Sequence, residues 1–77
     1  MTALLRYSLR ARREDIFYIS WTIDAYEGVG FLSTDNPDSG LVSVYCSSDY
    51  RDELESLFSA LDLEGIPVER LSVDAEV

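Results

Sequence analysis

The sequence predicts an α+β sandwich in which four antiparallel strands pack two helices against one face of a sheet. Three observations support this fold. Residues 5–12 alternate between apolar and polar side chains, residues 54–61 repeat apolar side chains at helical spacing, and residues 35–40 form a turn between two strand-like runs. The expected order is therefore strand, helix, strand, strand, helix, strand. With right-handed crossovers it gives the ferredoxin-like arrangement and leaves the other sheet face open.

The first strand is expected at residues 5–12, because strand side chains alternate between the two faces of a sheet. One face would carry Leu5, Tyr7, Leu9 and Ala11, and the other would carry Arg6, Ser8, Arg10 and Arg12. We expect the apolar face to be buried. The arginines are expected to be solvated on the open face or neutralised by neighbouring acids; the alternative is that they bind an anion or the carboxylates of a partner protein.

The run from Arg13 to Asp35 is the most apolar and aromatic stretch of the chain, and its first part fits two periods. A helix would place Ile16, Ile19, Ile23 and Tyr26 on one face, and a strand would align Phe17, Ile19, Trp21, Ile23 and Ala25. We favour the helix because strands are usually short and because Gly28-Val29-Gly30 suits the end of a helix. The alternative fold is a β-meander with a single helix.

The second and third strands are expected at residues 31–34 and 41–47, with a turn at 35–40 between them. Pro37 and Gly40 have backbone preferences that suit this turn. A calcium-binding loop is not expected, because Pro37 and Ser39 stand where such a loop needs ligands. The third strand would turn Val42, Val44 and Cys46 to one face and Leu41, Ser43 and Tyr45 to the other.

The second helix is expected to follow Ser47 or Ser48, either of which can cap it. Its apolar face carries Leu54, Leu57, Phe58 and Leu61, and Gly65 and Pro67 end it. Its acids, Asp49, Asp52, Glu53 and Glu55, are expected to face water rather than to form a metal site. A last strand is expected at 66–73, before an acidic tail at 74–77 that frays. Residues 1–77 would form one domain.

The charge distribution argues against several classes of function. The net charge is −9, lysine is absent, and four of the six basic residues lie within the first thirteen positions. So acidic a surface disfavours binding to nucleic acid and to anionic membranes. We see neither a signal peptide nor a run of apolar residues long enough to cross a bilayer, and we expect a soluble, cytoplasmic protein.

The cysteine and histidine content limits metal and redox chemistry. Cys46 is the only cysteine and histidine is absent, so one chain cannot build an internal disulfide, a structural zinc site or a cysteine-ligated iron–sulfur cluster. We expect no cofactor. Cys46 itself is expected to be a small core residue, and the alternative is a reactive thiol activated by the N-terminus of the following helix.

Several short pieces of the chain resemble a small bacterial family of uncharacterised domains. They are Asp15-Ile16, Tyr18-Ile19, Asp24-Ala25-Tyr26-Glu27-Gly28 and Ser33-Thr34-Asp35, followed by a glycine-ended turn and a leucine-rich helix. The motif residues are Asp24, Tyr26, Gly28, Thr34 and Asp35. The chain has Asp24 where glutamate is common in that family, and its Thr34 and Asp35 are closer together. Because the family has no established activity, the resemblance implies a fold and no catalytic residue.

The order of elements also resembles that of ACT-type regulatory domains, which bind amino acids. Those domains usually place a glycine between the first strand and the first helix. This chain has Arg12-Arg13-Glu14-Asp15 at that point, so the resemblance carries the arrangement of elements and not the amino-acid site.

The favoured function is that of a non-catalytic module, regulatory or protein-binding, that forms a homodimer or recruits another protein. If residues 16–23 are helical, Phe17 and Trp21 lie one turn apart on a flank that the sheet does not cover, and they are the first interface candidates. The competing interface is the open sheet face, with Arg6, Arg10 and Tyr45.

The alternative function is that of a small hydrolase resembling acylphosphatase. Such enzymes use an arginine near the first strand–helix turn and an asparagine on a neighbouring strand. Arg12 or Arg13 would supply the arginine and Asn36 the asparagine, but Asn36 falls in the expected hairpin turn and no phosphate-cradling loop is present. We therefore favour the non-catalytic module.

Overall fold

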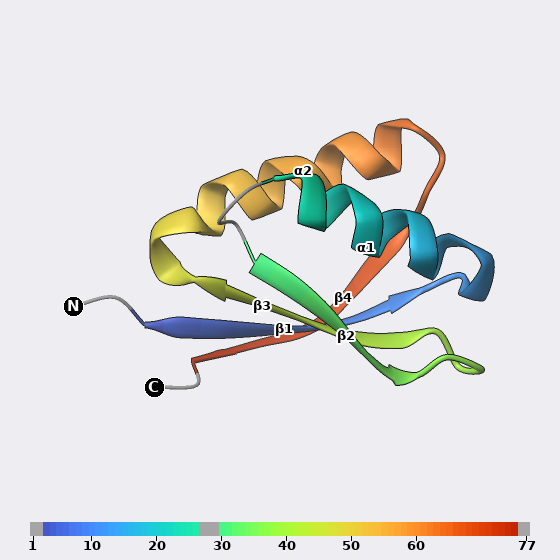
Figure 1. Cartoon of the computed structure of the whole chain (residues 1–77), viewed down its shortest axis with the longest axis horizontal. Coiled ribbons are helices and arrows are strands. Elements are labelled where there is room, and N and C mark those ends of the chain that lie inside the picture. Colours follow the sequence, from blue (N-terminus) through green and yellow to red (C-terminus); the bar gives the residue numbers. More distant parts are fainter. Residues whose placement is uncertain (1–2, 27–29, 76–77) are drawn as a thin grey trace.

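A computed structural model of the chain describes residues 3–26 and 30–75. Its elements are β1 (Leu4–Ala11), η1 (Arg13–Asp15), α1 (Ile16–Ala25), β2 (Gly30–Asn36), β3 (Leu41–Ser47), η2 (Ser48–Tyr50), α2 (Arg51–Leu63) and β4 (Val68–Ala75), where η marks a single 3-10 turn. The strands form one antiparallel sheet in the order β2-β3-β1-β4, and both helices cover the same face of it (Figure 1). This confirms the predicted ferredoxin-like fold, and the alternative β-meander is wrong.

The stretch that fits two periods is helical. In α1, Ile19 and Ile23 are buried, and Ile16 packs against the core from its edge. The helix ends at Ala25, and the N–H of Tyr26 donates to the carbonyl of Ile23 at 3.1 Å. The predicted stop at Gly28 lies outside the described residues. Since α1 is apolar on nearly every side, packing of the three isoleucines against the sheet is what selects the helix.

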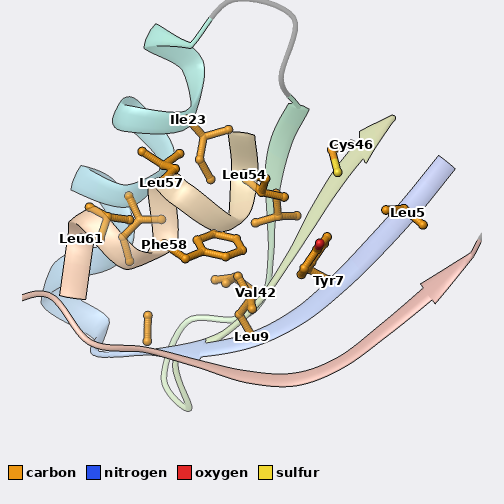
Figure 2. Close-up of a cluster of buried hydrophobic side chains, with 13 residues drawn as sticks. Leu5, Tyr7, Leu9, Ile23, Val42, Cys46, Leu54, Leu57, Phe58 and Leu61 are labelled. Atoms are coloured by element: carbon orange, nitrogen blue, oxygen red, sulfur yellow. The ribbon is translucent and has the colours of Figure 1, made fainter. Parts of the chain in front are cut away.

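The core lies between the sheet and the two helices, and β1 supplies its centre (Figure 2). Tyr7 of β1 stands opposite Val44 of β3 on one side and Val73 of β4 on the other. The ring of Tyr7 meets that of Phe58 edge to face, with centroids 5.7 Å apart. The buried apolar side chains are Leu5, Tyr7, Leu9, Ala11, Ile19, Ile23, Val42, Val44, Cys46, Leu54, Leu57, Phe58 and Leu61. The predicted apolar faces of β1, β3 and α2 are thereby confirmed.

The second helix begins through the turn η2. Of the two predicted caps, Ser47 accepts a hydrogen bond from the backbone N–H of Asp49, and Ser48 instead accepts one from the N–H of Ala3. At the other end, the N–H of Gly65 donates to the carbonyl of Asp62 at 3.0 Å. The predicted end of α2 near Gly65 is therefore confirmed.

Both edge strands differ from their predicted limits. β2 is longer than residues 31–34, because it pairs with β3 as far as Asn36 and accommodates one extra residue, Asp35, after Thr34. β4 begins at Val68 rather than at residue 66 and carries an extra residue, Leu71, in its pairing with β1. Each edge strand thus contains a bulge.

The acidic tail is shorter than predicted. Asp74 and Ala75, which we expected to fray, continue β4 and pair with Arg6 and Leu5 of β1. The reason is that β1 still offers backbone partners at this end of the sheet. Residues 76–77 lie outside the described part of the chain.

Gly40 and Gly65 both have positive φ angles, of 72° and 85°. Gly40 ends the β2–β3 turn, where its carbonyl accepts from the N–H of Ala11 at 2.9 Å. A Cβ atom at position 40 would lie only 1.9 Å from the carbonyl oxygen of Ala11, whereas one at position 65 would meet nothing within 4 Å. The positive φ angle favours glycine at both positions, and at position 40 the nearby Ala11 carbonyl also leaves no room for a Cβ atom.

We predict that Ile19→Ala lowers the free energy of unfolding by about 2–5 kcal/mol, because it leaves a cavity between α1 and the sheet. The control is Thr22→Ala in the same helix, where the lost group is a hydroxyl that donates to the Tyr18 carbonyl. This control should change stability by less than about 1 kcal/mol. Urea titrations of both variants measure the difference, and equal losses would contradict the burial of Ile19.

We predict that Gly40→Ala destabilises the fold more than Gly65→Ala. Both substitutions force alanine into the left-handed region, at a cost of about 1–2 kcal/mol. Only Gly40→Ala adds a clash with the Ala11 carbonyl and so disturbs the end of β1. Thermal and urea unfolding of the two variants provide the comparison, and the reverse order would show that the turn does not pack on Ala11 as described.

Candidate functional site

The outer side of α1 carries three exposed aromatic side chains, which we call the α1 aromatic face: Phe17, Tyr18 and Trp21. Phe17 is 84% exposed and Trp21 is 64% exposed. Tyr18 packs beside Trp21, with ring centroids 6.2 Å apart. These side chains point outward because Ile19 and Ile23 occupy the side of the helix that faces the sheet. The predicted exposure of Phe17 and Trp21 is therefore confirmed.

The α1 aromatic face also lacks charge. No residue between positions 16 and 23 is charged, although 27% of the chain is. Two large exposed aromatics in one uncharged patch are unusual on a monomer surface and are typical of contact sites. This face is the main candidate site of the molecule.

The open sheet face brings together the other predicted interface residues, Arg6, Arg10 and Tyr45, but all three have partners within the chain. Arg10 pairs with Glu69 at 3.8 Å, and the Arg6 Nε donates to the Ser43 hydroxyl at 3.2 Å. Tyr45 stacks on Phe31, with ring centroids 5.1 Å apart. The expected neutralisation of Arg10 by a neighbouring acid is confirmed.

Two residues of the open sheet face were not singled out from the sequence. Ser43 is fully buried there, and its hydroxyl donates to Asp35 Oδ2 at 2.6 Å while it accepts from Arg6. Asp35 reaches Ser43 as the extra residue of the β2 bulge, a local feature with no clear sequence signal. Phe31 is exposed, and its place beside Tyr45 follows only from the register of β2 on β3. A polar chain thus links β1, β3 and β2.

The four family-motif residues that the structure describes do not converge on one site. Asp24 and Tyr26 lie at the C-terminal end of α1, and both are exposed. Thr34 and Asp35 lie at the far end of β2, where Thr34 pairs with Val42. Gly28 is outside the described residues. The described motif residues therefore lie at the end of a helix and the end of a strand.

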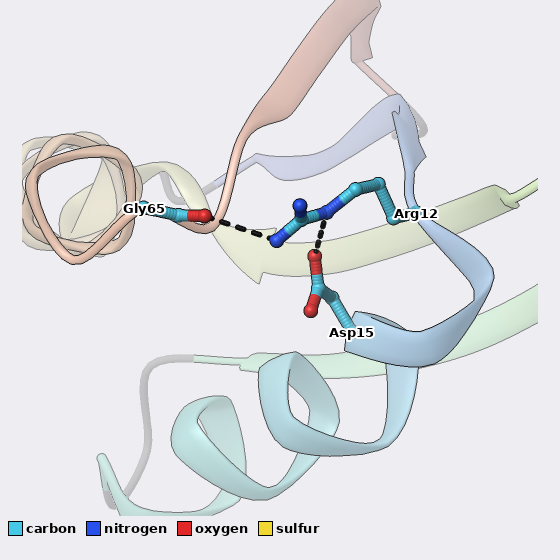
Figure 3. A network of polar contacts seen from close by, with 3 residues as sticks. All are labelled: Arg12, Asp15 and Gly65. Carbon is cyan, nitrogen blue, oxygen red and sulfur yellow. Dashed lines mark hydrogen bonds and ion pairs between the residues drawn. The ribbon is translucent and has the colours of Figure 1, made fainter.

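The residues named for the hydrolase hypothesis, Arg12, Arg13 and Asn36, all make structural contacts within the chain. The Arg12 guanidinium donates to Asp15 Oδ2 at 2.6 Å and to the carbonyl of Gly65 at 3.0 Å, which ties the start of α1 to the end of α2 (Figure 3). Arg13 pairs with Asp38 at 3.5 Å. The Asn36 side chain accepts from the N–H groups of the hairpin turn. The described residues therefore do not form the arginine–asparagine pair that the alternative hydrolase function would need, and Asn36 lies beside the hairpin turn as expected.

Two groups in or beside the core have perturbed pKa values. The Tyr7 hydroxyl donates to Glu55 Oε2 at 3.1 Å, and Glu55 also pairs with Arg70. Burial, followed by the bond to Glu55, raises the pKa of Tyr7 to about 12. Burial likewise raises the pKa of the Cys46 thiol, although the charge of Arg51 opposes this. Cys46 is thus a buried core residue, as predicted, and its environment disfavours the reactive thiolate.

Within residues 3–26 and 30–75, no three cysteine, aspartate or glutamate side chains gather into a group that could hold a metal ion. None of the described helices is long and apolar enough to cross a membrane.

A family model described as a domain of unknown function, DUF4911, matches residues 9–64. The matched range runs from β1 through the end of α2 and includes the α1 aromatic face. No curated protein and no solved structure matches the chain.

We predict that the free energy of unfolding falls as pH rises from 10 to about 12. In this window the Tyr7 phenol ionises in the unfolded chain, at its ordinary pKa of 10.0, but stays protonated in the folded one. Tyr7→Phe should remove this component and lessen the decline by up to about 1.4 kcal/mol per pH unit. Tyr50→Phe is the control at an exposed position. Urea titrations across the window measure the slopes, and identical slopes for wild type and Tyr7→Phe would contradict the prediction.

Proposed function

The chain belongs to the DUF4911 family, and on that footing we propose that it is a non-catalytic interaction module that pairs with a second copy of itself through the α1 aromatic face. One observation carries the proposal. Phe17 and Trp21 are exposed side by side on a helix whose inner face is already packed against the sheet. Aromatic side chains of this kind are the usual anchors of protein interfaces, because they bury much area and have few rotatable bonds.

Charge supports a second copy as the partner. At a net charge of −9, two copies repel each other wherever carboxylates face one another. The stretch 16–23 is itself uncharged, so two copies can meet over its centre, and the exposed acids Glu14 and Asp24 lie one turn beyond Phe17 and Trp21. A twofold axis passing between Phe17 and Trp21 would set Phe17 of each copy against Trp21 of the other, and a twofold interface needs this reciprocity.

The size of the chain also supports self-association. A domain of 77 residues buries only about 60% of the surface that its unfolded chain exposes, so its own core gives limited stability. Binding a second copy stabilises the folded state by mass action. Self-association of this kind suits a regulatory role, and we propose that the protein acts in the cytoplasm.

The open sheet face is the weaker candidate for the interface. Its arginines already have partners in the chain, so they have less to offer the acids of another copy. An interface built on such ion pairs loosens as salt rises, whereas an aromatic one does not. Nucleic acid and anionic membranes are poor partners for a chain of this charge.

We predict that the wild-type chain sediments as a dimer and that Trp21→Ala raises the dimer dissociation constant about thirtyfold or more, the effect of losing an interface anchor worth about 2 kcal/mol. Leu63→Ala is the matched control. Leu63 is 89% exposed on α2, so this variant also loses an exposed apolar side chain but outside the α1 aromatic face. It should dimerise like the wild type. Sedimentation velocity over a concentration series measures both constants.

Repeating the series at about 0.05 M and 0.5 M salt separates the two candidate surfaces. Dimerisation through the α1 aromatic face should be nearly independent of salt. A dimer that dissociates at high salt and tolerates Trp21→Ala would assign the interface to the open sheet face. A wild-type chain that stays monomeric at high micromolar concentration would refute self-association altogether.

A further inference from the structure

A groove lies between Tyr26, which follows α1, and the side of α2 formed by residues 52–60. Both helices cover the same face of the sheet (Figure 1). Its volume is about 460 Å³, and it is lined by Tyr26, Asp52, Glu53, Ser56, Leu57 and Ala60. Leu57 is buried and forms an apolar floor with Ala60. Tyr26, which follows α1 and is half exposed, forms a wall. Pockets for small ligands occupy about 300–1,000 Å³, so this groove suits a side chain and its neighbours rather than a whole helix.

Two carboxylates line this groove without a counterion. Within the described part of the chain, neither Asp52 nor Glu53 makes a hydrogen bond or an ion pair with a side chain. Other acids do have such partners. The pairs are Arg10–Glu69, Arg12–Asp15, Arg13–Asp38 and Arg70–Glu55. The groove therefore combines an apolar floor with uncompensated negative charge.

Among the described residues, no arginine lines the groove. Four of its six arginines form the ion pairs above, and Arg6 lies on the opposite face of the sheet, bonded to Ser43. Arg51 opens α2, and its charge acts on Tyr7 and Cys46 inside the sandwich. The groove can therefore accept a cation from another molecule.

We propose that this groove binds an arginine or lysine side chain presented by a partner protein. The carboxylates of Asp52 and Glu53 would hold the cationic head, and the ring of Tyr26 would add a cation–π contact. Leu57 and Ala60 would receive the aliphatic stem, which long basic side chains readily bury while the charged head stays polar. The carboxylates would repel an anionic ligand. An uncharged ligand would displace water from both carboxylates without replacing the lost hydrogen bonds, which costs free energy. The groove is separate from the α1 aromatic face, so this inference does not depend on self-association.

The test is a nuclear magnetic resonance titration of the ¹⁵N-labelled full chain with two tripeptides that differ only in charge. They are acetyl-Leu-Arg-Leu-amide and its citrulline counterpart, in which a neutral urea replaces the guanidinium. The arginine peptide should shift the amides of Tyr26 and of residues 52–60, and it should bind at least about tenfold more tightly than the citrulline peptide, as expected for a hydrogen-bonded charge pair. Equal affinities would overturn the proposal, because the groove would then select only for apolar surface.

Matched variants locate the charge effect. The double variant Asp52→Asn/Glu53→Gln keeps the shape of both side chains and should weaken binding of the arginine peptide about tenfold or more. Asp62→Asn removes one exposed carboxylate from the same helix outside the groove and should change the affinity by less than about twofold. Unchanged spectra of the free variants show that both are folded. Equal losses of affinity in the two variants would show non-specific attraction to an acidic protein and overturn the proposal. Amide shifts spread over all surface aspartates and glutamates would do the same.

The titration is repeated on Trp21→Ala. Because Trp21 does not line the groove, the arginine peptide should produce the same shifts and the same affinity in this background. If Trp21→Ala dissociates the dimer but leaves peptide binding unchanged, the groove binds peptide independently of the self-association surface. Loss of peptide binding in Trp21→Ala would place the site at the dimer interface and overturn the groove as described.

Discussion

The central strand β1 is the constraint on which the remaining structure depends. It pairs with β3 on one side and with β4 on the other, and its alternate side chains form the middle of the core. The two helices cover only one face of this sheet (Figure 1), and their buried side chains point toward it. The open sheet face and the outer side of α1 remain exposed as a direct consequence.

Much of this fold could be predicted because its patterns are local. The alternation in β1 and the spacing of Leu54, Leu57, Phe58 and Leu61 are each compatible with one conformation, and the turn before Gly40 separates two strands plainly. The stretch around Ile19 could not be assigned by period alone, since nearly every side chain there is apolar. Only its packing against a sheet of distant residues selects the helix.

The candidate site was predicted in part, and the missing part has a clear physical cause. Exposure of Phe17 and Trp21 follows from the inward face of their own helix, so the helical hypothesis was enough to find them. The contact between Ser43 and Asp35 depends on a bulge, and the groove depends on where the fold places Tyr26 relative to α2. The sequence shows how few arginines there are, but only the fold shows which acids they neutralise and which they leave alone.

The bulges at Asp35 and Leu71 have a consequence for how the molecule behaves at high concentration. Both lie in the outer strands of the sheet, where unpaired backbone groups can template the addition of another chain. An extra residue twists the strand and interrupts the even spacing of its amide and carbonyl groups. Neither border of the sheet therefore offers a long regular ladder for fibril growth. The exposed aromatic side chains of α1 thus belong to a molecule whose sheet borders disfavour uncontrolled extension into amyloid.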